Sequence, residues 1–416
     1  MKKSIYAMAL GAFGIITTEF GVIGVLPNLA EVFHVSLDTA GWLLSAFALT
    51  VAVSSPIITA FTGRINRKLL MTLVLGVFIL SNLLSAFSPD FTVLMIARVL
   101  PAVLHPLFWN ISLAVALKEA GSKGVSVVMA GVSIATVMGV PITTYAAEFF
   151  GNWQASFFLA SFVSLLAFSG LLLFVPSMPA PKKETGKSQL YVLKNPQLWL
   201  NLVSTILMLA GMFSSYGYLA AYMEKITHMN GVQISIMLLL FGAAGVLGNW
   251  LTGIALSRNV MLTTRIFFAL LIAVQILAYS FGTIFIPMVI ILSFWGAVHT
   301  GGFLIGNIRT TRAVPHDALE FVNSLLTSCY NIGISLGTML GGFAIARYGV
   351  HHIVWMSVSL LALTLGLSFI TFKKKTRAIV SLPEPEDIQA GIPEPSILTE
   401  HYKVVINSPG EKEEIV

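Results

Sequence analysis

The stretch from Ile5 to Ala30, IYAMALGAFGIITTEFGVIGVLPNLA, decides the fold class of this chain. Only Glu19 is charged among these 26 residues. About 20 mostly apolar residues suffice for a helix to cross the roughly 30 Å hydrocarbon core of a bilayer. Lys2 and Lys3 precede the stretch as in a signal peptide, but the apolar run reaches Pro27 without a small-residue cleavage site. The stretch therefore predicts an uncleaved transmembrane helix.

The rest of the chain repeats this pattern. Of the 416 residues, 56% are hydrophobic and 10% charged, against about 25% charged in soluble domains. Apolar runs bounded by charge, Pro or Gly predict twelve spans and an all-α membrane protein. The predicted spans are Ile5 to Ala30, Thr39 to Phe61, Leu69 to Phe87, Phe91 to Leu117, Val125 to Phe150, Ala155 to Val175, Leu198 to Met223, Val232 to Leu256, Met261 to Gly282, Ile284 to Asn307, Phe321 to Tyr348 and His351 to Phe372.

The positive charges predict the orientation of these spans. With the N-terminus in the cytoplasm, 21 of the 24 Lys and Arg fall in cytoplasmic segments, Lys225 and Arg347 fall outside, and Arg98 lies within a span. Cytoplasmic loops of membrane proteins carry such an excess. We therefore expect both termini in the cytoplasm, and we attribute the net charge of +6 to topology rather than to nucleic acid.

The spans divide into two sets of six. A polar stretch with Pro176, Pro179 and Pro181 separates them, and the fifth and eleventh spans share glycine positions, Gly139 with Gly337 and Gly151 with Gly349. Such parallel repeats give two facing bundles in transporters. We predict an N-terminal six-helix bundle over 1–176, a cytoplasmic linker over 177–197, a C-terminal six-helix bundle over 198–372, and a basic, then acidic, disordered tail over 373–416.

Glu19 and Arg98 are the charged residues predicted inside the membrane. Glu19 lies about 21 Å along its helix from the inner face and Arg98 about 10 Å from the outer face, which is the same level in a 30 Å core. An ionisable side chain at this depth usually marks function. A carboxylate there can gain and lose a proton as its access to water changes. We expect this pair to couple transport to protons; a static ion pair that fixes helix packing is the alternative.

Further polar and aromatic side chains predict a solute cavity. His105 and Trp109 follow Arg98 on one face of the fourth span, Trp295 and His299 lie four residues apart in the tenth, and Asn331 is at mid-depth in the eleventh. Aromatic rings with a few hydrogen-bonding groups suit a small polar or amphiphilic solute. Ordinary packing is the alternative for the aromatic residues, and a packing role is as good an explanation for His105.

Glycine and proline mark the fifth span as a pivot. Gly131 and Gly139 allow a neighbouring backbone to approach, and Pro141 removes a donor and bends the helix. A kinked, closely packed helix suits a rocking motion between halves, with generic helix packing as the alternative.

Several motifs resemble the major facilitator superfamily, in the drug:proton antiporter branch that includes sugar, arabinose and purine efflux transporters. The likeness covers about Ile5 to Phe372. It implies the twelve-helix major facilitator fold, proton coupling at Glu19 and Arg98, and an antiporter signature at Gly139-Val140-Pro141. The motifs that carry it are Thr17-Thr18-Glu19-Phe20, Gly24-Val25-Leu26-Pro27, Ala97-Arg98-Val99, His105, Phe108-Trp109-Asn110-Ile111-Ser112, and Asn331-Ile332-Gly333-Ile334 with Gly337.

The loop after the second span departs from the family pattern. It contains Gly63, Arg64, Arg67 and Lys68, and Gly63 stands where the superfamily usually has an aspartate. The residues predict a cytoplasmic gate loop, but a charge relay built on that acid is doubtful. Gln154 likewise replaces an arginine found in many relatives.

Together these observations predict proton-coupled efflux of a small organic solute, sugar or drug-like, across a bacterial cytoplasmic membrane. A proton-coupled importer or facilitator and a non-transporting sensor are the alternatives. An enzyme is disfavoured because motifs such as HExxH and GxSxG are missing from the sequence. The single cysteine, Cys329, and the lack of metal-ligand spacing predict neither metal nor cofactor. The expected partners are the solute, protons and the lipid bilayer, with no nucleic acid, and the expected state is a monomer.

Overall fold

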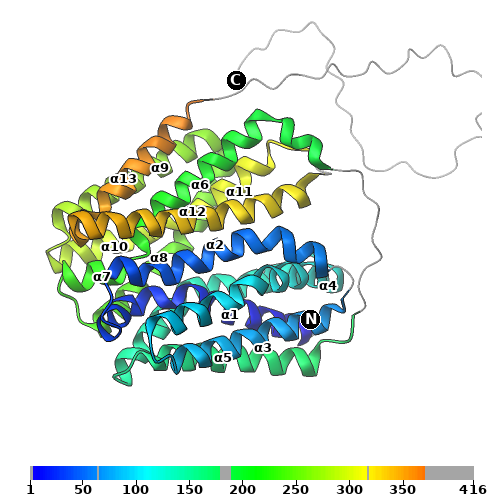
Figure 1. Ribbon diagram of the computed structural model, residues 1–416. Coiled ribbons are helices and arrows are strands. Elements are labelled where there is room, and N and C mark those ends of the chain that lie inside the picture. The colour runs from blue at the N-terminus through cyan, green and yellow to red at the C-terminus, as the bar shows by residue number, and fades with distance from the viewer. Residues whose placement is uncertain (1–2, 63–64, 179–188, 316–317, 371–416) are drawn as a thin grey trace, which may run out of the picture. The chain divides into compact units, whose positions relative to one another are not determined.

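The computed structural model describes residues 3–62, 65–178, 189–315 and 318–370, and this part of the chain is helical, without strands (Figure 1). Residues 1–372 and 373–416 are separate units, and the predicted tail, part of the predicted linker, Gly63 and Arg64 lie outside the described residues. The first half holds α1 (Lys3–Val32), α2 (Leu37–Thr62), α3 (Arg67–Ala86), α4 (Phe91–Phe149) and α5 (Gln154–Phe174). The second holds η1 (Gln189–Lys194), α6 (Pro196–Tyr216), α7 (Leu219–Lys225), α8 (Gly231–Arg258), α9 (Val260–Phe281), α10 (Phe285–His299), α11 (Gly301–Thr311), α12 (Leu319–Tyr348), η3 (Val350–His352) and α13 (Ile353–Leu367).

The structure confirms the predicted spans. Within the described residues, eleven helical segments are long and apolar enough to cross a membrane. One of them, α4, has 59 residues and contains two spans, because Ala120 and Gly121 leave the helical conformation. Gly121 has φ +62°, a left-handed conformation that glycine adopts without strain. The total is therefore twelve, and the fourth and fifth predicted spans are joined in α4.

Asparagine and aspartate side chains start several of these helices. Asn66 caps α3, Asp90 caps α4 and Asn195 caps α6, each by accepting a backbone N–H of the first turn. At α8, Asn230 and Gln233 form a reciprocal capping box. These caps fix the points at which the loops between spans end.

The two halves pack mainly within themselves and meet along two helix pairs. In the first half α1 contacts α4 and α5, and α3 contacts α5; in the second α6 contacts α12 and α13, and α8 contacts α10. The halves are joined where α2 packs on α12 and where α4 packs on α8. In Figure 1, α2 and α12 run side by side between the halves.

Glycines in the fifth and eleventh spans occupy equivalent places in the two halves. A Cβ at Gly139 would lie 2.9 Å from the Thr17 hydroxyl of α1, and one at Gly337 would lie 2.5 Å from the Ala210 carbonyl oxygen of α6. Gly151 and Gly349 follow the two spans with φ +65° and +85°. In each half, a glycine of the predicted pair therefore packs against the first helix of that half, α1 or α6.

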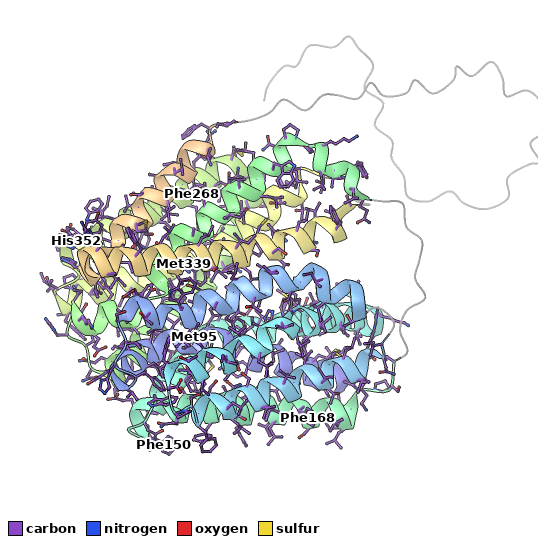
Figure 2. The ribbon with its side chains drawn as sticks, in the orientation of Figure 1. Met95, Phe150, Phe168, Phe268, Met339 and His352 are labelled. Atoms are coloured by element: carbon purple, nitrogen blue, oxygen red, sulfur yellow. The ribbon has the colours of Figure 1, made fainter. Side chains whose placement is uncertain are left out.

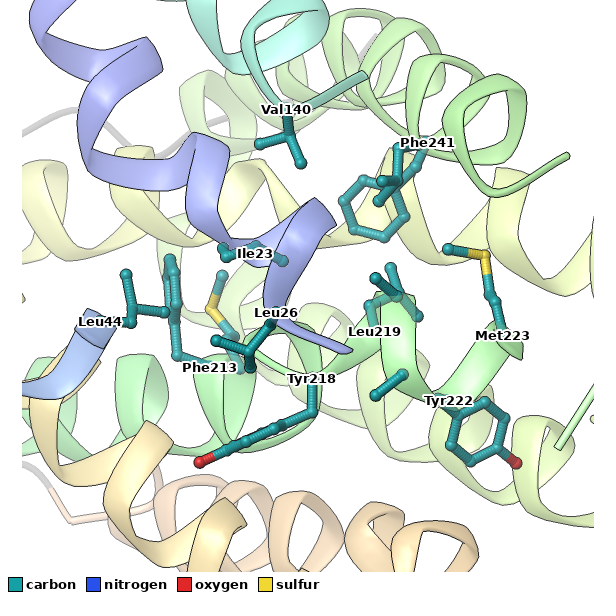
Figure 3. Close-up of a cluster of buried hydrophobic side chains, with 14 of the residues drawn as sticks. Ile23, Leu26, Leu44, Val140, Phe213, Tyr218, Leu219, Tyr222, Met223 and Phe241 are labelled. Carbon is teal, nitrogen blue, oxygen red and sulfur yellow. The ribbon is translucent and has the colours of Figure 1, made fainter. Parts of the chain in front are cut away.

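Apolar packing differs between the two ends of the helices. We call the end where α1 begins and α5 ends the linker side, and the end where α1 and α4 finish the far side. Phe150 and His352 lie at the far side (Figure 2). There, one buried cluster includes Ile23 and Leu44 of the first half and Phe213 of the second (Figure 3). At the linker side each half has its own cluster. This shared core joins the two halves at the far side, and we refer to it as the far-side apolar seal.

Candidate functional site

Glu19 is buried in the middle of α1. Its side chain is 5% exposed, and its carboxylate Oε2 lies 3.3 Å from Nε2 of His105 on α4. The two atoms are close enough for an ion pair, yet neither ring nitrogen of His105 meets hydrogen-bond geometry. His105 was predicted as a cavity residue, and the structure places it beside the buried acid.

Arg98 is adjacent to Glu19, but it contacts the backbone of α1 instead of the carboxylate. Its Nη1 donates to the carbonyl of Thr18 at 2.9 Å and its Nη2 to the carbonyl of Glu19 at 3.2 Å. The guanidinium carbon also lies 5.5 Å from the centre of the Phe47 ring. The prediction that the two residues meet at one depth is right, and the predicted direct ion pair is wrong. A carbonyl keeps a second lone pair inside a helix, so the planar guanidinium can bind two successive carbonyls.

Residues that sequence reasoning missed complete this site. Asn82 of α3 donates from Nδ2 to the Thr18 hydroxyl at 3.0 Å and to the Phe78 carbonyl at 2.9 Å. The rings of Phe47 and Phe78 lie 6.0 and 6.5 Å from the His105 ring. Asn82 could have been found as an amide within an apolar span. The aromatic neighbours carry no comparable signal, because phenylalanine is common in every span.

In the second half, Trp295 and His299 join an aromatic cluster. The His299 ring lies 4.7 Å from Tyr216, 5.5 Å from Phe241 and 5.8 Å from Phe213. Trp295 lies 6.1 Å from Phe241. The predicted stripe of Trp295 and His299 is thus on one buried surface of α10. The indole Nε1 and the imidazole Nδ1 have no hydrogen-bond partner among the described residues.

One ring contact links the aromatic cluster to the buried acid. Phe20, the residue after Glu19, lies 5.8 Å from Phe213 across the two halves. This contact places the residue next to the acid against the aromatic cluster of the second half.

Trp109 and Asn331 lie apart from these contacts. Trp109 is partly buried and packs on the linker-side apolar cluster of the first half. Asn331 is 7% exposed and donates from its amide to the Thr327 carbonyl of its own helix, α12. Its Oδ1 has no partner among the described residues.

The predicted pivot residues lie against α1. Gly131 faces the backbone of Ala9, Gly139 faces Thr17, and Pro141 is buried inside α4. Close approach of these two helices therefore requires both glycines.

Of the predicted gate loop, Arg67 and Lys68 are described. The Lys68 ammonium donates to the Leu172 carbonyl at 2.9 Å, and the Arg67 backbone N–H donates to the Met178 carbonyl at 3.0 Å. Both contacts lie within the first half and tie the start of α3 to the end of α5. A gating role for this loop stays a prediction.

The described residues contain no group of three or more His, Cys, Asp or Glu side chains that could hold a metal ion. The contacts of the site bring a carboxylate, an imidazole and a guanidinium together between α1 and α4.

Comparisons with known proteins agree with this architecture. Residues 8–337 match the Major Facilitator Superfamily. Inner membrane transport protein YdhP of Escherichia coli (strain K12) is 31% identical over 382 residues, which cover 90% of this chain and 97% of that protein. The uncharacterized MFS-type transporter YtbD of Bacillus subtilis (strain 168) is 29% identical over 366 residues, with 85% and 91% covered.

Two solved structures share the fold. A mutant of the nucleoside transporter NupG superposes with a TM-score of 0.71 at 12% identity, covering 89% of this chain and 99% of that one. A bacterial homologue of the human lysosomal transporter Spinster, in an inward-facing and unoccupied conformation, gives 0.66 at 13% identity, with 88% and 93% covered. At these identities the likeness concerns the fold alone.

Proposed function

Because the chain belongs to the major facilitator superfamily, and is therefore a multi-pass membrane transport protein and not an enzyme, we propose that it exports a small organic solute in exchange for protons. The proposed solute is sugar-like or drug-like, and the proposed location is a bacterial cytoplasmic membrane with both termini inside. The proposed partners are the solute, protons and the bilayer, and the proposed state is a monomer.

The buried contact between Glu19 and His105 is the observation that carries this proposal. A carboxylate inside a membrane costs several kcal/mol unless a partner or a proton neutralises it. An acid and an imidazole 3.3 Å apart can together gain or lose one proton while both side chains stay buried. Arg98 is held on the α1 carbonyls and provides a fixed positive charge nearby. The pair is therefore suited to take up and release a proton during each cycle.

The apolar seal supports alternating access. With the predicted orientation, the shared core closes the external side, and the separate clusters lie at the cytoplasmic side. The proposed cycle then has a state in which solute enters from the cytoplasm. Proton uptake from outside follows after the halves rock, and proton release inside accompanies reloading.

The aromatic cluster is the proposed solute site. Its rings offer stacking surface, and the unpartnered nitrogens of Trp295 and His299 offer hydrogen bonds. The contact between Phe20 and Phe213 provides the physical link from solute to acid.

Proton movement in liposomes tests the proposal. The purified protein is reconstituted in a known orientation with an internal pH dye, and sugars, nucleobases and cationic drugs are added in turn. We expect a solute-triggered proton flux opposite to solute movement, which Glu19→Gln abolishes and His105→Gln reduces at least about tenfold. Glu31→Gln, an exposed acid on the same helix, is the matched control.

Other outcomes would replace the proposal. Proton and solute movement in the same direction would indicate an importer, and solute flux without protons a facilitator. Solute binding without any flux would indicate a sensor. Full proton-driven activity in Glu19→Gln would remove the acid from the coupling mechanism.

A further inference from the structure

A small polar pocket adjoins Arg98 within the first half of the chain. It lies among α1, α3, α4 and α5, and its lining includes Thr17, Asn82, Arg98, Thr143 and Ser156. Its volume of about 10 Å³ is close to the roughly 10–15 Å³ that the same measure requires for one water molecule. The pocket is therefore the size of a single water site.

Three polar atoms of this lining have no hydrogen-bond partner among the described residues. They are Thr17 Oγ1, Asn82 Oδ1 and Arg98 Nε. The three side chains are 3%, 1% and 3% exposed. Buried polar groups in folded proteins almost always find a partner, from protein or from ordered water. Both N–H groups of the Asn82 amide, and one N–H on each Nη of Arg98, already bind protein oxygens.

We propose that this pocket is a binding site for one structural water molecule. The water accepts a hydrogen bond from Arg98 Nε–H and donates its two hydrogens to Asn82 Oδ1 and Thr17 Oγ1. Three hydrogen bonds are typical of a buried water. A cation does not suit the pocket because the Arg98 guanidinium lines it, and an organic ligand does not fit its volume.

This water gives Arg98 a third fixed contact. Two nitrogens of the guanidinium bind the carbonyls of Thr18 and Glu19, and the third binds the water. The guanidinium is then held flat against α1, and the Glu19 carboxylate keeps His105 as its neighbour. The proposal explains why Arg98 does not pair with the acid, and it does not depend on the direction or coupling of transport.

The isosteric variant Thr17→Val tests the proposal, because the melting temperature changes in opposite directions for a water-filled and a dry pocket. If water is bound, the variant removes one of its three hydrogen bonds and lowers the melting temperature of the purified full-length protein. If the pocket is dry, the variant removes an unpaired buried hydroxyl, and the melting temperature rises or stays unchanged. Thr310→Val is the matched control, because the Thr310 hydroxyl is also buried without a partner but lies on α11, outside the pocket.

An experimental structure that resolves other buried waters decides the matter directly. We expect a single spherical density peak within hydrogen-bonding distance of all three atoms in the wild-type protein, and its loss or displacement in Thr17→Val. A dry pocket in the wild type would overturn the proposal whatever the melting temperatures. So would a rise in melting temperature for Thr17→Val that matches the change in Thr310→Val. If the variant fails to fold, the wild-type density alone decides whether the pocket holds a water molecule.

Discussion

Replacing Gly41 by alanine should weaken the far-side seal between the halves. Tyr218 lies between α6 and α7, is 1% exposed, and donates from its hydroxyl to the Thr338 carbonyl of α12 at 2.9 Å. A Cβ at Gly41 of α2 would overlap this hydroxyl. Gly342 of α12 encloses the same oxygen from another side, with its Cβ position 2.6 Å away. The tyrosine therefore cannot move aside without losing its hydrogen bond or the contact between halves.

The magnitude follows from these contacts. Leaving a buried hydroxyl without its partner costs about 1–3 kcal/mol, and overfilling a packed site costs a similar amount. We take about 2–3 kcal/mol for the sealed state, which lowers the ratio of sealed to open molecules by about 30- to 150-fold at 1.4 kcal/mol per factor of ten. The gain in helix propensity from glycine to alanine is the same in both states and cancels.

Spin labels across the far side measure this ratio. Val32 at the end of α1 and Lys225 at the end of α7 are both exposed and carry the labels after replacement by cysteine, with Cys329 changed to serine. The sealed protein should give one short distance, and Gly41→Ala should add a longer one. Gly366→Ala in α13 is the matched control, because a Cβ there meets nothing within 4 Å.

A second substitution shows whether the tyrosine hydroxyl is the cause. Tyr218→Phe removes the nearest of the overlapping atoms but keeps the ring atoms Cζ and Cε1, which lie 2.6 and 2.9 Å from the Cβ position of Gly41. The double variant should therefore recover part of the short distance. An unchanged distance distribution in Gly41→Ala would refute the reasoning. An equal change in Gly366→Ala, or no recovery in the double variant, would do the same.

Arg98→Lys should lower the stability of the purified protein by about 1–3 kcal/mol, because one ammonium cannot bind both α1 carbonyls in the geometry of the guanidinium. A thermal melt measures this loss, with Arg258→Lys, at an exposed arginine, as the control. A loss no greater than that of the control would contradict the prediction. Gly131→Ala should cost about 1–3 kcal/mol, since its Cβ meets the Ala9 carbonyl of α1. Gly253→Ala, whose Cβ makes only an ordinary side-chain contact, is its control, and equal melting temperatures would count against close packing of these helices.

The spans and the level of the charged residues could be predicted from the sequence. Each span forms its own backbone hydrogen bonds, so its length and apolar composition suffice to identify it. The depth of Glu19 and Arg98 follows from the rise per residue of a helix, and the structure confirms that they are adjacent. The paired glycines of the fifth and eleventh spans likewise predicted close packing, because the need for small residues is local to each helix.

The partner of the acid could not be predicted. Which of Arg98 and His105 reaches the Glu19 carboxylate depends on the rotation of α4 about its axis and on rotamers that neighbouring helices fix. Asn82 enters the site from α3, a helix whose place beside α1 is not encoded in any spacing along the chain.

The sequence by itself determined the class of protein, the number of spans and the two residues to examine, because these rest on local properties: apolar length, helix rise and the cost of a charge in the membrane. Only the tertiary structure decided that Arg98 binds backbone carbonyls, that His105 is the neighbour of Glu19, and that the far side is sealed through Tyr218 and Gly41. These contacts join residues from different helices or different halves. They depend on how the helices are turned and on which side of the transporter is closed, and a linear sequence specifies these only through the sum of all its packing interactions.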